Sequence, residues 1–117
     1  MASTDLTQER MAENQSRFRE ANERIEATAY NTQLLGPVPF ICECPNAECM
    51  EIVRLELDEY EAARENPRRF FVAHGHAGLS VAAGAAVIVD EKAGYTLVDK
   101  IGVAGEIAEA RYDEDPY

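Results

Sequence analysis

The sequence predicts an α+β fold in which an N-terminal helix precedes a small, mostly antiparallel sheet with one or two short helices, held together by a metal site. Residues 5–30 are polar with a thin apolar stripe at helical spacing, and segments typical of strands outnumber helical ones after residue 36. Three cysteines and the only two histidines lie between residues 42 and 76. At 117 residues the chain is long enough for one domain.

The first helix is predicted over residues 5–30. Asp5 and Gln8 have the spacing of a capping box, and the helix should end before Gly36 and Pro37. Its apolar residues are few, because Met11, Phe18 and Ile25 recur every seven positions while polar residues take the alternate positions. We therefore expect residues 1–35 to form a helical arm that docks on the domain or pairs with a protein partner or a second copy of the chain.

Two strands and a helix are predicted next. Residues 38–44 are apolar and β-prone, and residues 52–57 alternate as a half-buried strand does, so together they indicate a hairpin. Asp58 and Glu61 resemble a second capping box for a short helix that buries Tyr60. That helix should stop around Pro67.

The rest of the domain is predicted to contain a third strand and a second hairpin. Residues 70–73 form the third strand, and residues 77–84 form a loop or a short helix. Residues 86–90 and 95–99 form the hairpin, in which Gly94 should supply a positive φ.

Residues 105–112 allow one or two helical turns. The predicted organisation is thus a helical arm (1–35), a metal-containing α+β domain (36–112) and a frayed acidic tail (113–117).

Charge and hydropathy exclude several classes of function. The net charge of −11 disfavours binding to nucleic acid or to an anionic membrane, since both need a basic patch. The N-terminus is too polar for a signal peptide, and the longest uncharged run, residues 77–89, is too short to span a bilayer. We therefore expect a cytoplasmic protein that binds neither nucleic acid nor membrane.

The cysteines form a C-x-C-x4-C pattern at Cys42, Cys44 and Cys49. In a reducing compartment such a cluster is more typical of metal ligands than of disulfides. Cys42 and Cys44 lie on one face of a strand, and tetrahedral zinc needs their sulfurs about 3.8 Å apart, so the chain should bend there, where Pro45 follows.

A closed zinc site needs a fourth ligand, and His74 and His76 are the candidates. Gly75 between them allows a sharp turn beside the ion. Iron, an iron–sulfur centre, a redox disulfide, and three buried cysteines beside an exposed histidine pair are the alternatives.

Four short patterns follow one another along the chain. They are the C-x-C-x4-C loop, L-x-E-Y-E, P-x-R-F and a final G-H, here at residues 42–49, 57–61, 67–70 and 75–76. In these patterns residues 38–101, including Val98 to Lys100, resemble a group of small, mostly uncharacterised actinobacterial proteins. The histidine of that group falls on His76, and the group usually has proline where this chain has His74. The resemblance therefore implies Cys42, Cys44, Cys49 and His76 as the metal ligands.

Other chemistry has little support. The glycines lack the spacing of a P-loop or a dinucleotide-binding fingerprint, the H-x-E of a zinc deaminase is missing, and nothing marks Ser80 as a nucleophile. Glu43, Glu48 and Glu51 surround the cysteine loop, where one could act as a general base, but a solvated acidic face is the expectation.

The sequence favours a small zinc-binding module with a structural Cys3His site that acts in protein–protein interaction or regulation rather than as an enzyme. A metal also suits a globular part of only about 80 residues, whose core alone contributes little stability. The alternative is a zinc-dependent enzyme or a metal or redox sensor with an open or displaceable ligand. A third possibility, an inhibitor whose acidic surface imitates nucleic acid, is based on charge alone.

Overall fold

The computed structural model describes residues 2–33 and 35–114, with side chains described for residues 9–33 and 35–112. The α+β class is confirmed, but the strands form two small antiparallel sheets instead of one. In chain order the elements are α1 (Ala2–Asn31), β1 (Val38–Ile41), β2 (Ile52–Leu55), α2 (Leu57–Arg64), β3 (Arg69–Val72), α3 (Gly78–Ala82), β4 (Ala86–Glu91), β5 (Thr96–Lys100) and α4 (Gly102–Glu114).

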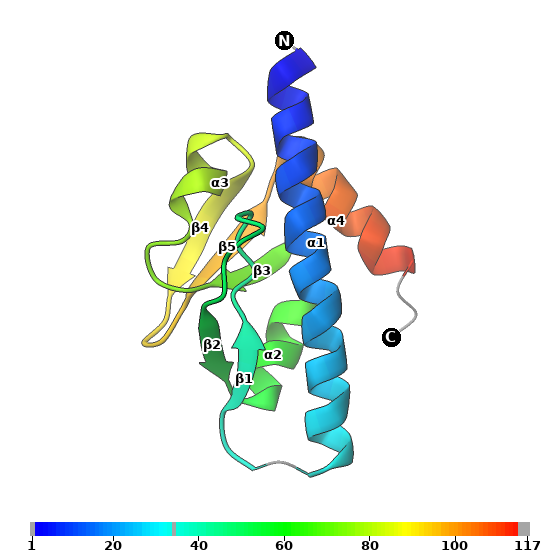
Figure 1. Cartoon of the computed structure of the whole chain (residues 1–117), viewed down its shortest axis with the longest axis vertical. Coiled ribbons are helices and arrows are strands. Elements are labelled where there is room, and N and C mark those ends of the chain that lie inside the picture. The colour runs from blue at the N-terminus through cyan, green and yellow to red at the C-terminus, as the bar shows by residue number, and fades with distance from the viewer. Residues whose placement is uncertain (1, 34, 115–117) are drawn as a thin grey trace.

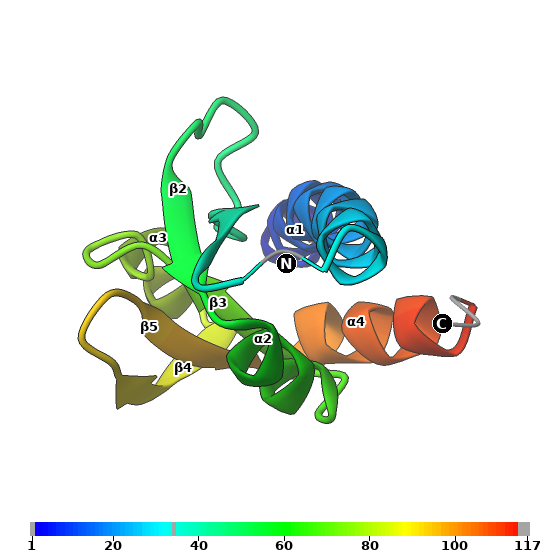
Figure 2. The same ribbon diagram turned by 90° about the horizontal axis from the view of Figure 1, so that it is seen from below.

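Helix α1 runs along the whole molecule (Figure 1). Its 30 residues correspond to about 45 Å of helix, close to the 48 Å long axis of the chain. It packs against β1 and α4, as Figure 2 shows from below, which agrees with the docking alternative for this helix. Asp5 lies inside α1 instead of at its start, so the predicted capping box does not begin the helix; the side chains of Asp5 and Gln8 lie outside the described residues.

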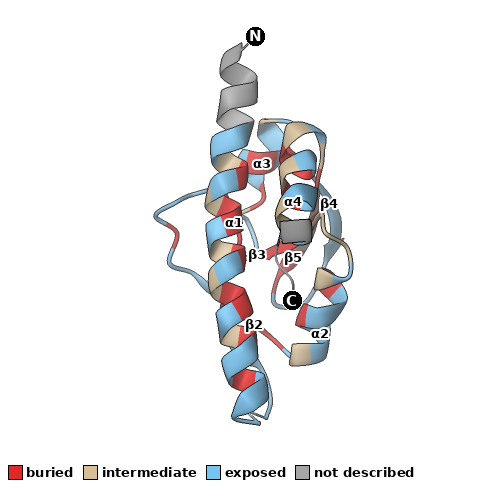
Figure 3. Cartoon of the chain, turned by 90° about the vertical axis from the view of Figure 1, so that its right-hand side faces the viewer, coloured by how far each residue is buried: buried red, intermediate tan, exposed pale blue. Residues whose placement is uncertain are grey.

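The buried face of α1 is mainly polar. Buried residues recur along the helix (Figure 3), and the predicted apolar residues Met11, Phe18 and Ile25 are only partly buried. The buried polar side chains are those of Gln15, Ser16, Arg19, Asn22, Glu23 and Glu26. Glu26 lies near Glu23 and Glu61, and its burial together with these carboxylates raises its pKa to about 7.

The first sheet is the predicted hairpin of β1 and β2, with Val38 opposite Leu55 and Ile41 opposite Ile52. Both strands are shorter than expected, so the ten residues 42–51 form the connection that carries all three cysteines.

The second sheet has the order β3-β5-β4 and includes the predicted second hairpin. Gly94 does not have the expected positive φ. The turn is closed by a hydrogen bond of 2.7 Å from the Lys92 N–H to the Tyr95 carbonyl, and β4 contains a register shift between Ile88 and Asp90, so the reversal requires no left-handed residue at position 94.

Helix α2 begins two residues earlier than the capping box predicted from Asp58 and Glu61. Glu56 is the N-cap, and its backbone N–H donates to the Glu59 carboxylate at 2.9 Å, which completes a capping box. The predicted buried face is confirmed, because Tyr60 and Ala63 face the core.

The core joins both sheets to α2 through aromatic rings. Phe40 and Tyr60 stack with centroids 4.4 Å apart, and Phe71 meets each of them edge-on at 5.9 Å. The three cysteines belong to the same buried cluster, so the candidate ligands lie at the margin of the apolar core.

Residues 77–84 contain the short helix α3, and α4 is longer than the one or two turns expected. Asp113 and Glu114, placed in the predicted tail, still belong to α4, and the rest of that tail lies outside the described residues. Among the described helices, none is both long enough and apolar enough to cross a membrane.

Candidate metal centre

The hairpin connection between β1 and β2 brings the three cysteines together. β1 ends at Ile41, so Cys42 and Cys44 lie where the chain leaves the strand, which agrees with the predicted bend. The N–H of Cys42 still donates to the Glu51 carbonyl at 3.0 Å, and the N–H of Cys49 donates to the Asn46 carbonyl at 3.0 Å. These bonds fold the connection back on itself, so that Cys49 returns to the other two cysteines.

A tight turn after β3 separates the two histidines. The N–H of His76 donates to the Ala73 carbonyl at 3.0 Å, and Gly75 has a φ of +84°, which is the pattern of a type II turn. An added Cβ at Gly75 would meet nothing within 4 Å, so glycine is needed for its φ and not for close approach. Type II turns favour proline at the position before this glycine, and in this chain His74 occupies that position.

The structure brings His76 to the cysteines and directs His74 elsewhere. The Nδ1 atom of His74 lies 3.1 Å from the Thr96 hydroxyl, and its Nε2 atom lies 3.2 Å from the Ala93 carbonyl oxygen. The Nδ1 atom of His76 lies 3.6 Å from the sulfurs of both Cys42 and Cys49. Among the described residues, Cys42, Cys44, Cys49 and His76 form the group that could hold a metal ion; we call it the Cys3His cluster.

Two distances within the Cys3His cluster match tetrahedral coordination. With metal–sulfur bonds near 2.3 Å and metal–nitrogen bonds near 2.0 Å, a tetrahedron separates sulfur from nitrogen by about 3.6 Å. The two measured sulfur–Nδ1 distances are 3.6 Å, and all four ligand atoms lie within 4.8 Å of one another. The cluster can therefore accommodate one ion with little rearrangement.

Backbone N–H groups point at all three sulfurs. Ala73 donates to the Cys42 sulfur at 3.2 Å, Asn46 donates to Cys44, and Glu51 donates to Cys49. Such bonds disperse the negative charge that three thiolates bring to a metal. The Cys42 thiol also donates to the Cys44 sulfur, which lowers the pKa of Cys44 to about 5 and raises that of Cys42.

Polar side chains of α1 hold the backbone of residues 41–45, which we call the ligand segment. Asn22 bonds both backbone groups of Ile41, accepting from its N–H and donating to its carbonyl at 2.8 Å each, as a neighbouring strand would. About two turns nearer the N-terminus, Gln15 donates to the Glu43 carbonyl at 3.2 Å and the adjacent Asn14 donates to the Pro45 carbonyl at 2.8 Å. Helix α1 thus satisfies the backbone of the segment that carries Cys42 and Cys44.

Glu43 does not belong to a solvated acidic face as expected, because its side chain is fully buried. Arg19 binds both of its carboxylate oxygens, from Nε at 2.7 Å and from Nη2 at 2.8 Å. Asn22 and the N–H of Phe71 donate to the same carboxylate. Glu48 and Glu51, in contrast, are exposed as predicted. The side chain between the two ligand cysteines therefore anchors the ligand segment to α1 and β3.

The sequence patterns did not identify the residues that hold the ligand segment in place: Asn14, Gln15, Arg19, Asn22 and Glu43. One signal was present. Alternation along the strand puts Glu43 on the opposite side from Cys42 and Cys44, and the polar residues of α1 recur at helical spacing. A buried carboxylate needs a cation, and a buried polar helix face needs hydrogen-bond partners, so the two patterns complement each other.

No known protein-family model, curated protein or solved structure matches this chain. The resemblance to small actinobacterial proteins therefore stays a prediction from the motifs at residues 38–101.

Proposed function

We propose that the protein is a small cytoplasmic zinc-binding module in which the Cys3His cluster holds one structural zinc ion. The observation that carries the proposal is the match between the 3.6 Å sulfur–Nδ1 distances and the edge of a zinc tetrahedron. Three sulfurs and one imidazole nitrogen are also donors that bind zinc in preference to magnesium or calcium.

The burial of the ligands supports a structural role over a catalytic one. Cys42, Cys44 and Cys49 are 0%, 3% and 8% exposed. Four protein ligands complete the coordination of zinc and leave no position for a water or a substrate. A catalytic zinc would keep such a position, so the geometry favours a module that acts through its surface.

The ion would join the two sheets. The cysteines belong to the β1–β2 connection, and His76 follows β3 of the other sheet. In the described part of the chain, the Glu43 N–H also donates to the Phe71 carbonyl at 3.0 Å, and the Phe40 and Phe71 rings meet edge-on across the same junction. Because zinc binding to such ligands contributes directly to folding, losing the ion should weaken the contact between the sheets.

The surface role proposed for the module is binding to a protein partner or to a second copy of the chain, with α1 as part of that interface. Tyr30 near the end of α1 is 69% exposed, so its ring is open to contact with a partner, and tyrosine is enriched at protein interfaces. Light scattering after size-exclusion chromatography, over a range of concentrations, tests the second-copy form. A mass of 13.0 kDa throughout would exclude it.

Metal analysis of the purified, reduced protein tests the zinc proposal. We expect one zinc per chain in the wild type and in His74→Ala, and loss of the ion in Cys44→Ser and His76→Ala. His74→Ala is the matched control, because it removes an imidazole from the same turn but outside the cluster. X-ray absorption should show three sulfurs near about 2.3 Å and one nitrogen near about 2.0 Å.

Three results would contradict the proposal. They are a metal-free wild type, iron in place of zinc, and equal loss of zinc in the two histidine variants. A coordinated water oxygen in place of one ligand would instead favour the enzyme or sensor alternative.

A further inference from the structure

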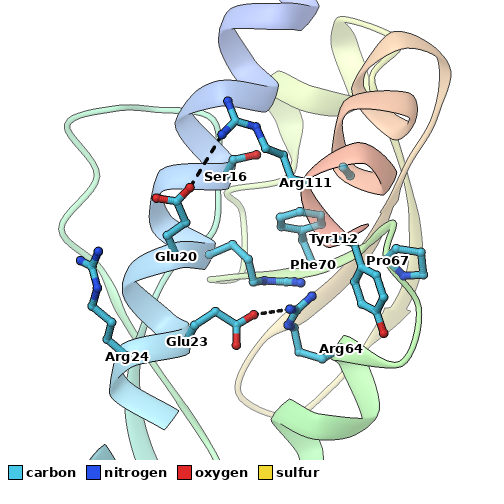
Figure 4. A pocket seen from close by; sticks show the side chains of 11 residues that line it. Ser16, Glu20, Glu23, Arg24, Arg64, Pro67, Phe70, Arg111 and Tyr112 are labelled. Carbon is cyan, nitrogen blue, oxygen red and sulfur yellow. Dashed lines mark ion pairs between the residues drawn. The ribbon is translucent and has the colours of Figure 1, made fainter. Parts of the chain in front are cut away.

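A cavity of about 390 Å³ between α1, α2 and α4 is lined by charges that are already paired (Figure 4). Arg64 pairs with Glu23, as the figure shows, and Arg111 pairs with Glu13. Both guanidinium groups therefore have a partner within the chain, and the lining does not single out a ligand. A different part of the surface is open to a partner, and it belongs to α3 and β4.

Residues 78–89 form an apolar surface, which we call the α3–β4 surface. Helix α3 packs against β4, so the side chains of both elements contribute to it. Its large apolar side chains are each between 42% and 58% exposed: Leu79, Val81, Val87, Ile88 and Val89. None of residues 77–89 is charged, although the net charge of the chain is −11. Exposed apolar patches with charged residues around them are typical of protein interfaces.

Strand β4 also has an edge that can pair with another strand. It lies at the border of the sheet β3-β5-β4, on the side away from α1 (Figure 1). The Lys100 N–H donates to the Arg68 carbonyl, so by alternation along β5 the backbone of Val98 is also directed to β3. Ile88 lies opposite Val98, and its N–H and carbonyl therefore point away from β5. Ala86 is only 2% exposed and a register shift follows Ile88, so pairing of the backbone is confined to Ile88.

Charge indicates which partner fits the α3–β4 surface. A cationic partner is attracted to the acidic parts of the chain, and an uncharged surface gives it no such attraction. Two copies of a chain with a net charge of −11 repel each other, and the repulsion is smallest where the surfaces in contact carry no charge. The same surface on a second copy is both apolar and uncharged, so it meets this requirement.

An antiparallel arrangement of two β4 strands keeps their carboxylates apart. With a twofold axis at Ile88, the two Ile88 residues lie opposite each other and can exchange two backbone hydrogen bonds. Val87 of each copy then lies opposite Val89 of the other, and β-branched pairs of this kind stabilise a sheet. Asp90 falls opposite the uncharged Ala86 of the second copy. A parallel arrangement would instead bring the two Asp90 carboxylates together.

We propose that two copies of the chain associate through the α3–β4 surface, with their β4 strands antiparallel across a twofold axis at Ile88. Leu79 and Val81 would lie at the margin of the interface. Because only one residue of each strand pairs through its backbone, we expect a weak dimer, with a Kd of about 1 μM to about 1 mM. The inference rests on the second-copy form of the proposed function and gives that form a surface separate from α1.

Sedimentation equilibrium of the zinc-loaded, reduced full chain tests the proposal, at concentrations from about 10 μM to about 1 mM. We expect the average mass to rise from 13.0 kDa toward twice that value. Ile88→Lys should weaken association at least about tenfold, because two like charges then meet at the axis, although the substitution makes each chain less negative. In the wild type, the amide hydrogen of Ile88 should exchange more slowly as the concentration rises.

Two further experiments separate this contact from a folding defect and from a contact through α1. An equimolar mixture of Ile88→Lys and Ile88→Glu chains should associate again, because opposite charges then meet at the axis. Chains that had merely lost their fold would not be rescued in this way. Tyr30→Lys is the matched control, since it adds the same charge to an exposed apolar residue of α1, and it should associate as the wild type does.

Three outcomes would overturn the proposal. They are a wild type that stays at 13.0 kDa at every concentration, a mixture of the two Ile88 variants that does not associate, and dissociation by Tyr30→Lys but not by Ile88→Lys. The first would leave the α3–β4 surface to a different protein. The third would identify α1 as the interface between copies, so the two surfaces are distinguished. The metal analysis described above tests zinc binding separately.

Discussion

Replacing Arg19 by methionine should destabilise the protein strongly, although Arg19 is neither a core hydrophobe nor a candidate metal ligand. The substitution keeps most of the apolar stem and removes the guanidinium. It abolishes the two bonds to Glu43 and a third bond, of 2.6 Å, to the Arg69 carbonyl. Glu43 is then left with 0% exposure and without its counter-charge.

The cost follows from the burial of the pair. Breaking a buried ion pair by removing one partner costs about 3–5 kcal/mol, because the other charge remains in a low-dielectric interior. Asn22 and the Phe71 N–H still bond the carboxylate, so we expect the lower end, about 3 kcal/mol. For a chain of this size that corresponds to a fall of about 10 °C in melting temperature.

Urea unfolding of the zinc-loaded, reduced protein measures this cost, and a competition with a zinc chelator measures the metal affinity. Affinity should fall about tenfold, since Glu43 lies between Cys42 and Cys44 and groups that orient metal ligands have effects of this size. Arg68→Met is the matched control: it breaks the exposed pair with Glu109 and should cost less than about 1 kcal/mol. Adding Glu43→Gln to the Arg19 variant should restore part of the loss, because no unpaired charge remains.

The reasoning fails if Arg19→Met costs no more than the Arg68 control, or if zinc affinity is unchanged while stability falls. The first outcome would mean that Glu43 is not held by Arg19 in solution. The second would mean that the ligand segment keeps its geometry without α1.

Three further changes test other parts of the fold. The pKa of Glu26, about 7, lies above its ordinary value of 4.5, so the folded protein holds an extra proton between these values and loses stability as the pH rises from 4.5 through 7. Glu26→Gln should therefore melt at a higher temperature than the wild type at about pH 8, and its melting temperature should depend less on pH. Identical profiles of melting temperature against pH would contradict the raised pKa of Glu26. Lys100 is 1% exposed, and among the described residues its ammonium has no hydrogen-bond partner, although it lies 4.3 Å from the Phe70 ring centroid. Burial lowers the pKa of Lys100, so the stability of the wild type should increase as the pH rises toward 10.5. In urea titrations Lys100→Met should be more stable than the wild type at neutral pH and should lack this dependence on pH. A less stable variant would show that the charge of Lys100 is needed. Gly105→Ala would place a methyl group 2.8 Å from the Lys100 carbonyl oxygen and should cost about 1–3 kcal/mol in thermal melts, whereas Gly78→Ala, with nothing within 4 Å, should be neutral or slightly stabilising.

Local patterns predicted much of the fold because they depend on neighbouring residues. The alternation in residues 52–57 indicated β2, and the spacing of Tyr60 and Ala63 indicated the buried face of α2. Helix boundaries were less certain: the capping box at Glu56 and the one expected at Asp58 differ only by two positions in a run of acidic residues. Several carboxylates there could have served as the cap.

The role of α1 was not predictable by the same means. Its apolar stripe is thin, so periodicity alone suggested a loosely docked or dimer-forming helix. What holds it in place is polar: Asn22, Gln15 and Arg19 bond a segment more than 18 residues away in the chain. The periodic polar residues of α1 show that this face needs partners, but they do not show which distant segment supplies them.

The sequence by itself determined that three cysteines share one short connection, that a glycine turn follows with a histidine on each side, and that the surrounding residues form an α+β fold. Residue spacing and φ preference act within a few residues, which is why these features can be predicted from the sequence alone. Only the tertiary structure decided that His76 faces the cysteines while His74 faces Thr96, and that Glu43 faces α1 instead of water. Which neighbour covers each side of a strand or turn depends on the packing of elements distant in the chain, and the free energy of that packing is not encoded in any one of them.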